Sequence, residues 1–300
     1  MSKAARPLNP RRIAVLAGST FTQLVRMKVF YFMGIATVIL LAANFLDLPT
    51  LSAPEAQGVG VLYSVKSSAF GLMALFSLVL GIVATALLLP RDVEDRTLYT
   101  ILAKPVPRLD YLLGKLIGVC ALILVSLIVL DLLMLGVLHY RTNVVLSQQE
   151  ELAKMAGYSP EETTQMLQET RLLGPTWSLQ GGVLALFCRA MVMASVAMLL
   201  STFSTSTLFT AITGFLVLFI GFFQADARDY YFDGNGFLSR GGAAIMSIIL
   251  PDLQIYNIAD AVMEGRVLEA IDLVRVVAIT LFYFVLYTFC SWLIFARKEF

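Results

Sequence analysis

Six long apolar runs alternate with polar segments along the chain. A helix needs about 20 mostly apolar residues to cross the hydrocarbon core of a bilayer. Runs of about this length lie at residues 29–46, 69–90, 116–138, 183–201, 205–223 and 276–296. They are too long and continuous for barrel strands, and a backbone in lipid must satisfy its own hydrogen bonds. The pattern predicts an all-α integral membrane protein, a six-helix bundle formed by residues 1–300 as one domain.

Composition supports this class and excludes others. The chain is 58% hydrophobic and 14% charged, whereas soluble domains average about 45–50% apolar and 25% charged residues. A net charge of +1 gives no support for nucleic-acid binding. The three cysteines lie inside apolar runs and His139 is the single histidine, so the sequence predicts neither a disulfide framework nor a metal site.

The distribution of Lys and Arg sets the predicted orientation. With the N-terminus inside, basic residues are about three times as dense in the inner segments as in the outer ones. We therefore expect a plasma-membrane protein with both termini cytoplasmic. Residues 1–28 mix basic and apolar positions, which favours an amphipathic helix in the inner headgroup layer. A frayed basic lead to the first span is the alternative.

Two outer segments have their own patterns. In the outer helical loop 139–182, Ser-x-x-Glu patterns starting at Ser147 and Ser159 predict two short capped helices. They fit a substrate gate, a partner-docking surface or a solvated hairpin. The outer region 224–275 contains an apolar octet, 243–250, that is too short to span, which favours a re-entrant or interfacial turn.

The inner loop 91–115 reads as a short cytoplasmic helix. Pro90 suits a first turn, and the acidic residues after it favour a helix N-terminus. An apolar stripe follows at helical spacing, and Pro105 and Pro107 end the helix. Such a stripe must be buried against the membrane, the bundle or another protein.

The same loop carries a family resemblance. Glu94-Asp95-Arg96-Thr97-Leu98, followed by Pro105-Val106, Arg108 and Gly114-Lys115, resembles the inner-loop signature of ABC-2 type transporter permeases. Arg96 stands where glycine is common in that signature, and Pro107 where serine is. The outline of the chain is also similar to the branch grouped with copper-enzyme maturation.

The resemblance implies a permease subunit, more often of an exporter, that pairs with a second permease subunit as a homodimer or heterodimer. It implies that the loop is a coupling helix docking on an ABC ATP-binding subunit, which would hold ATP and Mg. The implied ATPase-coupling residues are Val93, Glu94, Arg96, Thr97, Leu98, Ile101, Leu102, Pro105, Arg108 and Lys115. This chain would not be an enzyme and would bind no cofactor, and its other contacts would be with membrane lipid.

The residues independently exclude a nucleotide site here. A phosphate-binding loop needs a glycine five positions before its Gly-Lys pair. Leu109 stands there before Gly114-Lys115, the chain's single Gly-Lys pair. Two other function classes stay open: a membrane scaffold of an ATP-dependent complex, and an intramembrane enzyme, although the chain has no His-Glu-x-x-His motif.

Two charged residues, Asp131 and Arg189, fall within predicted spans, where charges are costly. Counted from the span ends, both lie about 10 Å below the outer surface. We expect them to form an ion pair or to line a polar pathway; separate snorkelling toward the surface is the alternative.

Overall fold

The computed structural model describes residues 8–43, 57–94, 106–204, 206–232, 249–263 and 268–297. Most of this part is helical, and the described residues contain no strand. The helices are α1 (Pro10–Val25), α2 (Lys28–Ala42), α3 (Gln57–Glu94), α5 (Arg108–Ala156), α6 (Pro160–Leu172), α7 (Trp177–Phe203), α8 (Thr207–Phe232), the short 3-10 helix η3 (Gln254–Tyr256), α10 (Ala259–Met263) and α11 (Ala270–Arg297). The predicted all-α fold class is confirmed.

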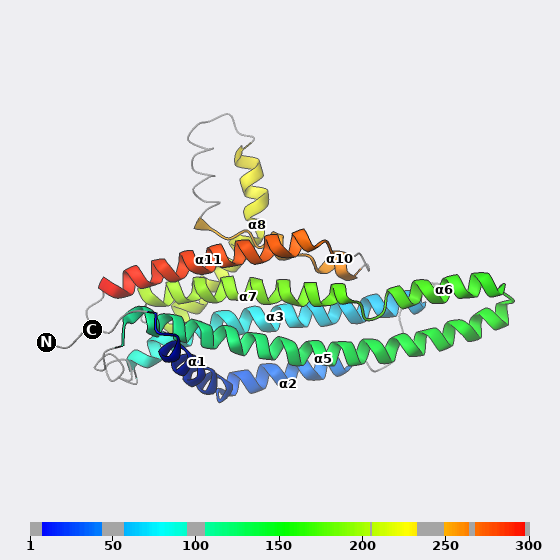
Figure 1. The fold of residues 1–300 in the computed structure, drawn as a ribbon, viewed down its shortest axis with the longest axis horizontal. Helices are drawn as coiled ribbons and strands as arrows, with labels where there is room; N and C mark the ends of the chain where they lie inside the picture. Colours follow the sequence, from blue (N-terminus) through cyan, green and yellow to red (C-terminus); the bar gives the residue numbers. More distant parts are fainter. Residues whose placement is uncertain are drawn as a thin grey trace.

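Five of the described helices are long and apolar enough to cross a membrane, and a sixth is counted if α1 and α2 form one broken span. The long helices α3, α5, α7 and α11 run side by side along the molecule (Figure 1). α2 has 15 residues, a length of about 22 Å. It meets α1 at a bend of 67°. The chain therefore has the helix complement of a multi-pass membrane protein.

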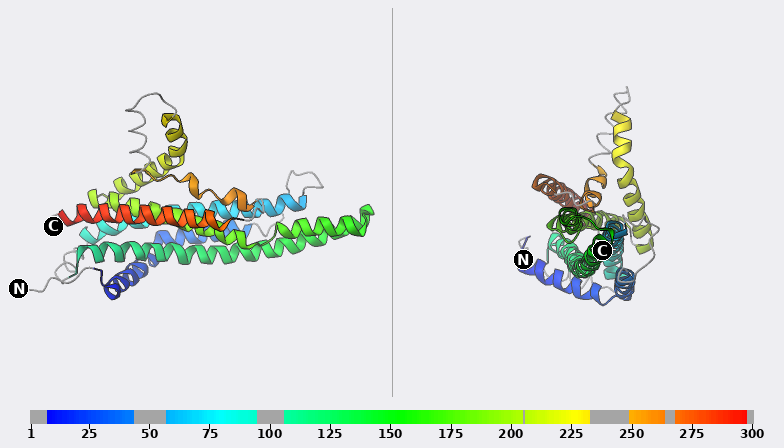
Figure 2. Two further views of the ribbon diagram at one scale, coloured as in Figure 1. Left: turned by 45° about the horizontal axis from the view of Figure 1, so that its top comes forward. Right: turned by 90° about the vertical axis from the view of Figure 1, so that its right-hand side faces the viewer.

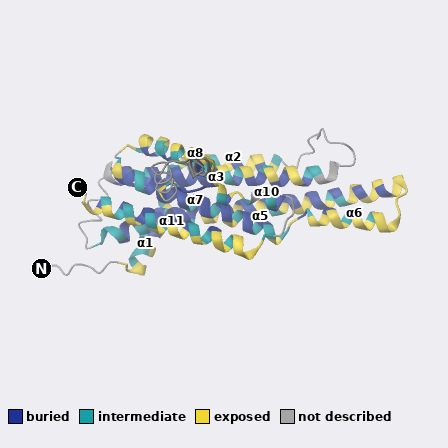
Figure 3. Ribbon diagram, turned by 90° about the horizontal axis from the view of Figure 1, so that it is seen from above, coloured by how far each residue is buried: buried dark blue, intermediate teal, exposed yellow. Residues whose placement is uncertain are grey.

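α7 occupies the centre of the bundle, and small residues allow its neighbours to approach it (Figure 3). A Cβ atom added at Gly81 of α3 would lie 3.1 Å from the carbonyl oxygen of Ala190. At Gly182 an added Cβ would lie 2.7 Å from the ring of Phe70. Such close approach is the usual route to tight packing between helices in lipid.

α1 packs across the start of α5 at a glycine pair. Cβ atoms added at Gly114 and Gly118 would lie 2.5 Å from the Cβ of Leu16 and 2.7 Å from the Cβ of Thr20. The four-residue spacing of these glycines therefore forms a groove for α1. Within the predicted amphipathic segment 1–28, of which residues 1–7 lie outside the described part, Pro10–Val25 form the helix α1. Its buried positions, Ala17, Thr20 and Leu24, include those that face α5.

α5 differs from the sequence prediction at its outer end. The first of the two expected short helices is wrong, because α5 continues without a break through Ser147 to Ala156. At 49 residues α5 is about 74 Å long, far more than a bilayer needs. The second expected helix is confirmed as α6, with a capping box between Ser159 and Glu162.

α5 and α6 together form a hairpin that extends beyond the other helices (Figure 2). Gly157 turns the chain between them with φ 73°, a left-handed conformation that glycine adopts without strain. Thr170 Oγ1 donates to Gln149 Oε1 at 2.6 Å, and both side chains are buried between the two helices. The hairpin therefore has a small polar core of its own.

α8 packs on α7 and α3 along its first part, and its last part stands away from the bundle (Figures 1 and 2). The chain then returns to the bundle over residues 249–258. The backbone N–H of Leu253 donates to the Gly221 carbonyl at 3.0 Å, and Gln254 Nε2 donates to the Phe222 carbonyl at 2.8 Å. Most of the apolar octet 243–250 lies outside the described residues, but this return segment is attached to α8.

Candidate functional site

A dense set of polar contacts lies where α3 ends and α5 begins, on either side of the predicted coupling loop. Lys115 Nζ lies 2.7 Å from Asp92 Oδ2, and both side chains are about 95% buried. The hydroxyl of Tyr111 donates to the same carboxylate oxygen. Because Asp92 belongs to α3 and the other two residues to α5, this cluster fixes the two ends of the loop to each other.

The sequence builds this cluster from helical spacing. Tyr111 and Lys115 are four residues apart on α5, so their side chains lie on one face and both reach Asp92. The ammonium of Lys115 lies 5.8 Å from the centre of the Tyr111 ring, which stacks in turn on Phe295 with centroids 5.9 Å apart. An ion pair held by aromatic rings is thus closed off from water.

Arg108 connects the start of α5 to the end of α11. Its guanidinium donates to the carbonyl oxygens of Phe295 at 2.6 Å and Ala296 at 2.9 Å. The last carbonyls of a helix lack partners within the helix, and they carry its negative partial charge. Arg108 therefore acts as a cap for α11.

Asp110 joins the same region to α1. This fully buried carboxylate accepts the backbone N–H of Leu8 at 2.6 Å, and Arg12 NH2 lies 3.3 Å from it. Further along α1, Gln23 Oε1 accepts a hydrogen bond from Lys115 at 3.5 Å. We call this set the inner network; it consists of Arg12, Gln23, Asp92, Arg108, Asp110, Tyr111 and Lys115.

A second polar group lies between α7, α8, α11 and the return segment. It lines a cavity of about 350 Å³ that includes Gln224, Asp252 and Tyr283. Both side-chain atoms of Gln224, the Nε2 and the Oε1, are buried without a hydrogen-bond partner. Nearby, the guanidinium of Arg189 lies 5.6 Å from the centre of the Phe222 ring. We call these four polar residues, Arg189, Gln224, Asp252 and Tyr283, the central polar cluster.

The level of Arg189 along the bundle follows from the contacts of the residue next to it. Ala190, next to Arg189, contacts Gly81, which also lies beside Ile123 of α5. Ile123 falls within the predicted third span, 116–138. Arg189 therefore lies at the level of the long apolar stretches of α3 and α5, where an unpaired polar atom is expensive once those stretches are in a bilayer.

Comparison with known families decides the identity of this arrangement. Residues 13–225 match the family described as ABC-2 family transporter protein. The chain belongs to this ABC-2 family. No curated protein is significantly similar to it in sequence. An ABC-2 family chain is a membrane subunit of a transporter and is not itself catalytic, and the family implies association with an ABC ATP-binding subunit.

The ABC-2 coupling residues predicted from the sequence divide into two groups. Arg108 and Lys115 lie in the inner network. Val93 and Glu94 end α3, and their side chains, like residues 95–105, lie outside what the structure describes. Their role in ATPase coupling stays a prediction.

The start of the predicted coupling helix needs a correction. Pro90 does not begin a separate helix, because α3 continues through it to Glu94. Proline removes one backbone hydrogen bond inside a helix. The contacts of Asp92 with Lys115 and Tyr111 hold the last turn in place beyond it. Asp92, Tyr111 and Asp110 were missed as site residues; the signal available was their polar character beside apolar runs.

The expected ion pair between Asp131 and Arg189 is wrong. Asp131 lies beside the side chain of Gln180 on α7. Gln180 and Arg189 are nine residues apart on α7, which is about 14 Å along the helix axis. The two charges therefore lie at different depths. Within the described residues, no three His, Cys, Asp or Glu side chains gather closely enough to hold a metal ion.

Proposed function

We propose that this chain is the permease of an ABC exporter in which a separate ATP-binding subunit docks on the loop 95–105. In this proposal the chain resides in the plasma membrane with both termini in the cytoplasm, pairs with a second permease subunit, and leaves ATP and Mg to the partner. The observation that carries the proposal is the buried 2.7 Å contact of Lys115 with Asp92, which closes the two ends of the loop.

The inner network explains how movement of the loop would reach the bundle. The loop is bracketed by α3 and α5, and the same few residues connect it to α1 through Asp110 and to α11 through Arg108. A displacement applied by a partner would therefore move four helices together, because their ends share one set of buried contacts. This is the mechanical requirement for coupling ATP-driven closure of the partner to rearrangement of the permease.

The central polar cluster supplies a candidate region for substrate contact. Its cavity of about 350 Å³ lies between α8, α11 and the return segment, and an amide with no hydrogen-bond partner lines it. Polar groups buried among membrane-spanning helices usually serve function, since they cost stability. A substrate that hydrogen-bonds Gln224 would remove this cost during passage.

The decisive experiment tests the docking partner. The tagged chain is purified from its native membranes in mild detergent, and co-purifying proteins and ATP hydrolysis are measured. We expect an ATPase with Walker motifs to co-purify, and to be lost from a variant carrying Leu98→Asp and Ile101→Asp. Thr100→Asp is the control for the single variant Leu98→Asp, because each adds one negative charge to the same loop and Thr100 lies away from the predicted apolar stripe.

Two outcomes contradict the proposal. One is the absence of any ATPase under conditions that keep a known transporter intact. The other is equal loss of the ATPase from the Thr100→Asp control, which would show that the stripe is not the docking surface. Thermal unfolding of each purified variant verifies that the permease itself remains folded.

A further inference from the structure

A cavity of about 930 Å³ lies at the elbow between α1 and α2, where the two helices bend by 67°. Five polar residues, two of them cationic, line it together with two apolar ones. The lining residues are Ser19, Thr22, Gln23, Arg26, Met27, Lys28 and Leu87. None of these seven described residues is acidic. The cavity therefore has the chemistry of an anion site.

The backbone adds to this character. Lys28 and Val29 open α2, and the first N–H groups of a helix have no partner within the helix. They carry the positive end of the helix dipole, which favours a negative group. The side chains of Arg26 and Lys28 are both exposed, so they are accessible to a ligand that arrives from outside the bundle.

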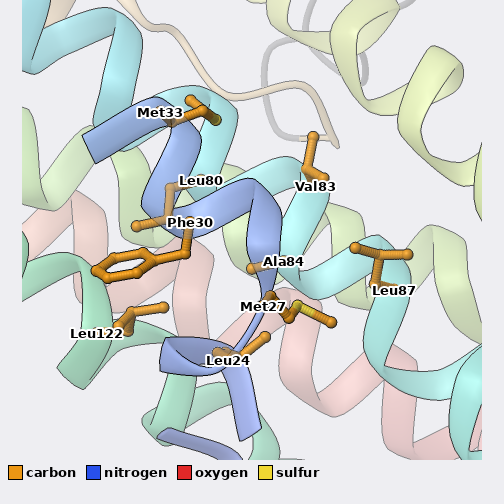
Figure 4. Close-up of a pocket in the computed structure, with 9 residues that line it drawn as sticks. All are labelled: Leu24, Met27, Phe30, Met33, Leu80, Val83, Ala84, Leu87 and Leu122. Atoms are coloured by element: carbon orange, nitrogen blue, oxygen red, sulfur yellow. The ribbon is translucent and has the colours of Figure 1, made fainter. Parts of the chain in front are cut away.

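An apolar recess adjoins the cavity directly. Figure 4 shows its nine lining side chains, which come from the end of α1, from α2, α3 and α5, and are all apolar. The cavity and the recess share Met27 and Leu87. The recess is shallow, with room of about 10 Å³, so a hydrocarbon chain would lie along it and not inside it.

A polar, cationic space continuous with an apolar surface matches one kind of occupant. We propose that the elbow binds an anionic phospholipid of the inner leaflet, with its phosphate at Arg26 and Lys28 and an acyl chain along the recess. A free phosphate would satisfy the cations but would leave the recess uncovered. Basic pockets of this type on the cytoplasmic side of helix bundles suit anionic headgroups.

The location gives such a lipid contact with the inner network. Gln23 lines the cavity, and its side-chain oxygen accepts a hydrogen bond from Lys115, which pairs with Asp92. A headgroup that orders the end of α1 would therefore also support the contacts that hold the flanks of the loop 95–105. The inference concerns lipid binding alone and does not depend on which ATPase docks.

The test compares lipids on the purified full-length chain. Delipidated protein in detergent is titrated with phosphatidylglycerol, with phosphatidylcholine and with inorganic phosphate, and binding is followed by native mass spectrometry and by the midpoint of thermal unfolding. We expect phosphatidylglycerol to bind and to raise the midpoint, with phosphatidylcholine and phosphate much weaker. The double variant Arg26→Gln with Lys28→Gln should lose about 30-fold in affinity for phosphatidylglycerol.

The controls separate the elbow from general surface charge and from misfolding. Arg11→Gln removes an exposed cation from the same helix outside the cavity and should leave the affinity within about twofold. Leu87→Gln makes the junction of cavity and recess polar and should weaken phosphatidylglycerol without affecting phosphate. If the double variant unfolds, the single variant Lys28→Gln replaces it.

Three results would overturn the proposal. Equal binding of the two phospholipids would remove the role of charge. Equal binding of phosphate and phosphatidylglycerol would leave an anion site with no lipid component. An equal loss in Arg11→Gln and in the elbow variants would assign the effect to the whole basic surface of α1.

Discussion

The inner network and the central polar cluster both bury polar side chains, but they differ in whether those side chains have partners. In the inner network each buried carboxylate has a cation beside it: Asp92 has Lys115, and Asp110 has Arg12. In the central polar cluster neither polar atom of the Gln224 amide has a hydrogen-bond partner.

This difference suggests different roles. The inner network connects helices, whereas the central polar cluster has polar atoms that a ligand can pair with. A buried group that is hydrogen-bonded contributes modestly to stability, whereas one left unsatisfied costs about 1–3 kcal/mol. The inner network can therefore hold four helices in one arrangement. The central polar cluster favours any change that supplies partners, either a bound molecule or a rearrangement of α8 and α11 around the cavity.

The largest expected effect comes from breaking the charge pair of the inner network. Lys115→Met removes the cation that lies 2.7 Å from the buried Asp92 carboxylate, and breaking a buried ion pair by removing one partner costs about 3–5 kcal/mol. We expect the free energy of unfolding, measured by denaturing-detergent titration, to fall by that amount. Loss of the contact that joins the end of α3 to the start of α5 should also lower the amount of ATPase that co-purifies with each folded permease.

A double variant tests whether the charge itself is responsible. Asp92→Asn combined with Lys115→Met removes both charges and keeps an oxygen acceptor for Tyr111. It should recover most of the stability lost in the single variant, since removing a whole buried pair is often close to neutral. A double variant as unstable as the single one would show that packing, and not charge, dominates the network.

The helices could be predicted from the sequence, but the contacts of the inner network could not. The apolar runs predicted the long helices because a bilayer demands about 20 apolar residues, and Ser159 predicted its cap because a capping box is local. The contact of Asp92 with Lys115 joins residues on either side of a loop, and no periodicity reports such a pair. Local signals at Pro90 and Ser147 gave wrong helix ends, because packing carried both helices past them.

The predicted equal depth of Asp131 and Arg189 was wrong for a related reason. Asp131 and Arg189 were placed by counting from the ends of apolar runs, but α5 continues outward well beyond its apolar run, so the end of the run does not set the register between helices. The register is set by contacts such as Gly81 with Ala190. Gln224 and Asp252 came together only because the chain returns to α8 after leaving the bundle.

The packing of α1 on α5 can be tested at the glycines of α5. A Cβ atom at Gly118 would lie 2.8 Å from the Ala17 carbonyl oxygen, so Gly118→Ala should push α1 away and destabilise the protein by about 1–3 kcal/mol. Gly136 lies on the same helix with nothing within 4 Å of an added Cβ. Gly136→Ala should instead stabilise by about 0.5–1 kcal/mol through helix propensity.

Both variants are measured by the same unfolding titration. If Gly118→Ala lowers the free energy of unfolding and Gly136→Ala raises it, α1 is packed tightly against α5. Equal small effects would mean that α1 is loosely attached, and the inner network would then connect three helices and not four.

The smallest expected effect compares two buried glutamines directly. Gln149 in the outer hairpin and Gln224 in the central polar cluster are 7% and 6% exposed, so their burial is matched. Gln149 accepts a hydrogen bond from Thr170, and Gln224 has no partner. Replacement by leucine leaves the Thr170 hydroxyl without this side-chain acceptor in the first case and removes an unsatisfied amide in the second.

We therefore expect Gln149→Leu to lower the free energy of unfolding by about 1 kcal/mol and Gln224→Leu to leave it unchanged or raise it by a similar amount. Transport should respond in the reverse order, because Gln224 lines the cavity and Gln149 lies far from it in the hairpin. If Gln224→Leu destabilises as much as Gln149→Leu, the amide has a structural partner in the membrane-embedded protein. The central polar cluster would then resemble the inner network, since both would be part of the scaffold and neither would be open to substrate.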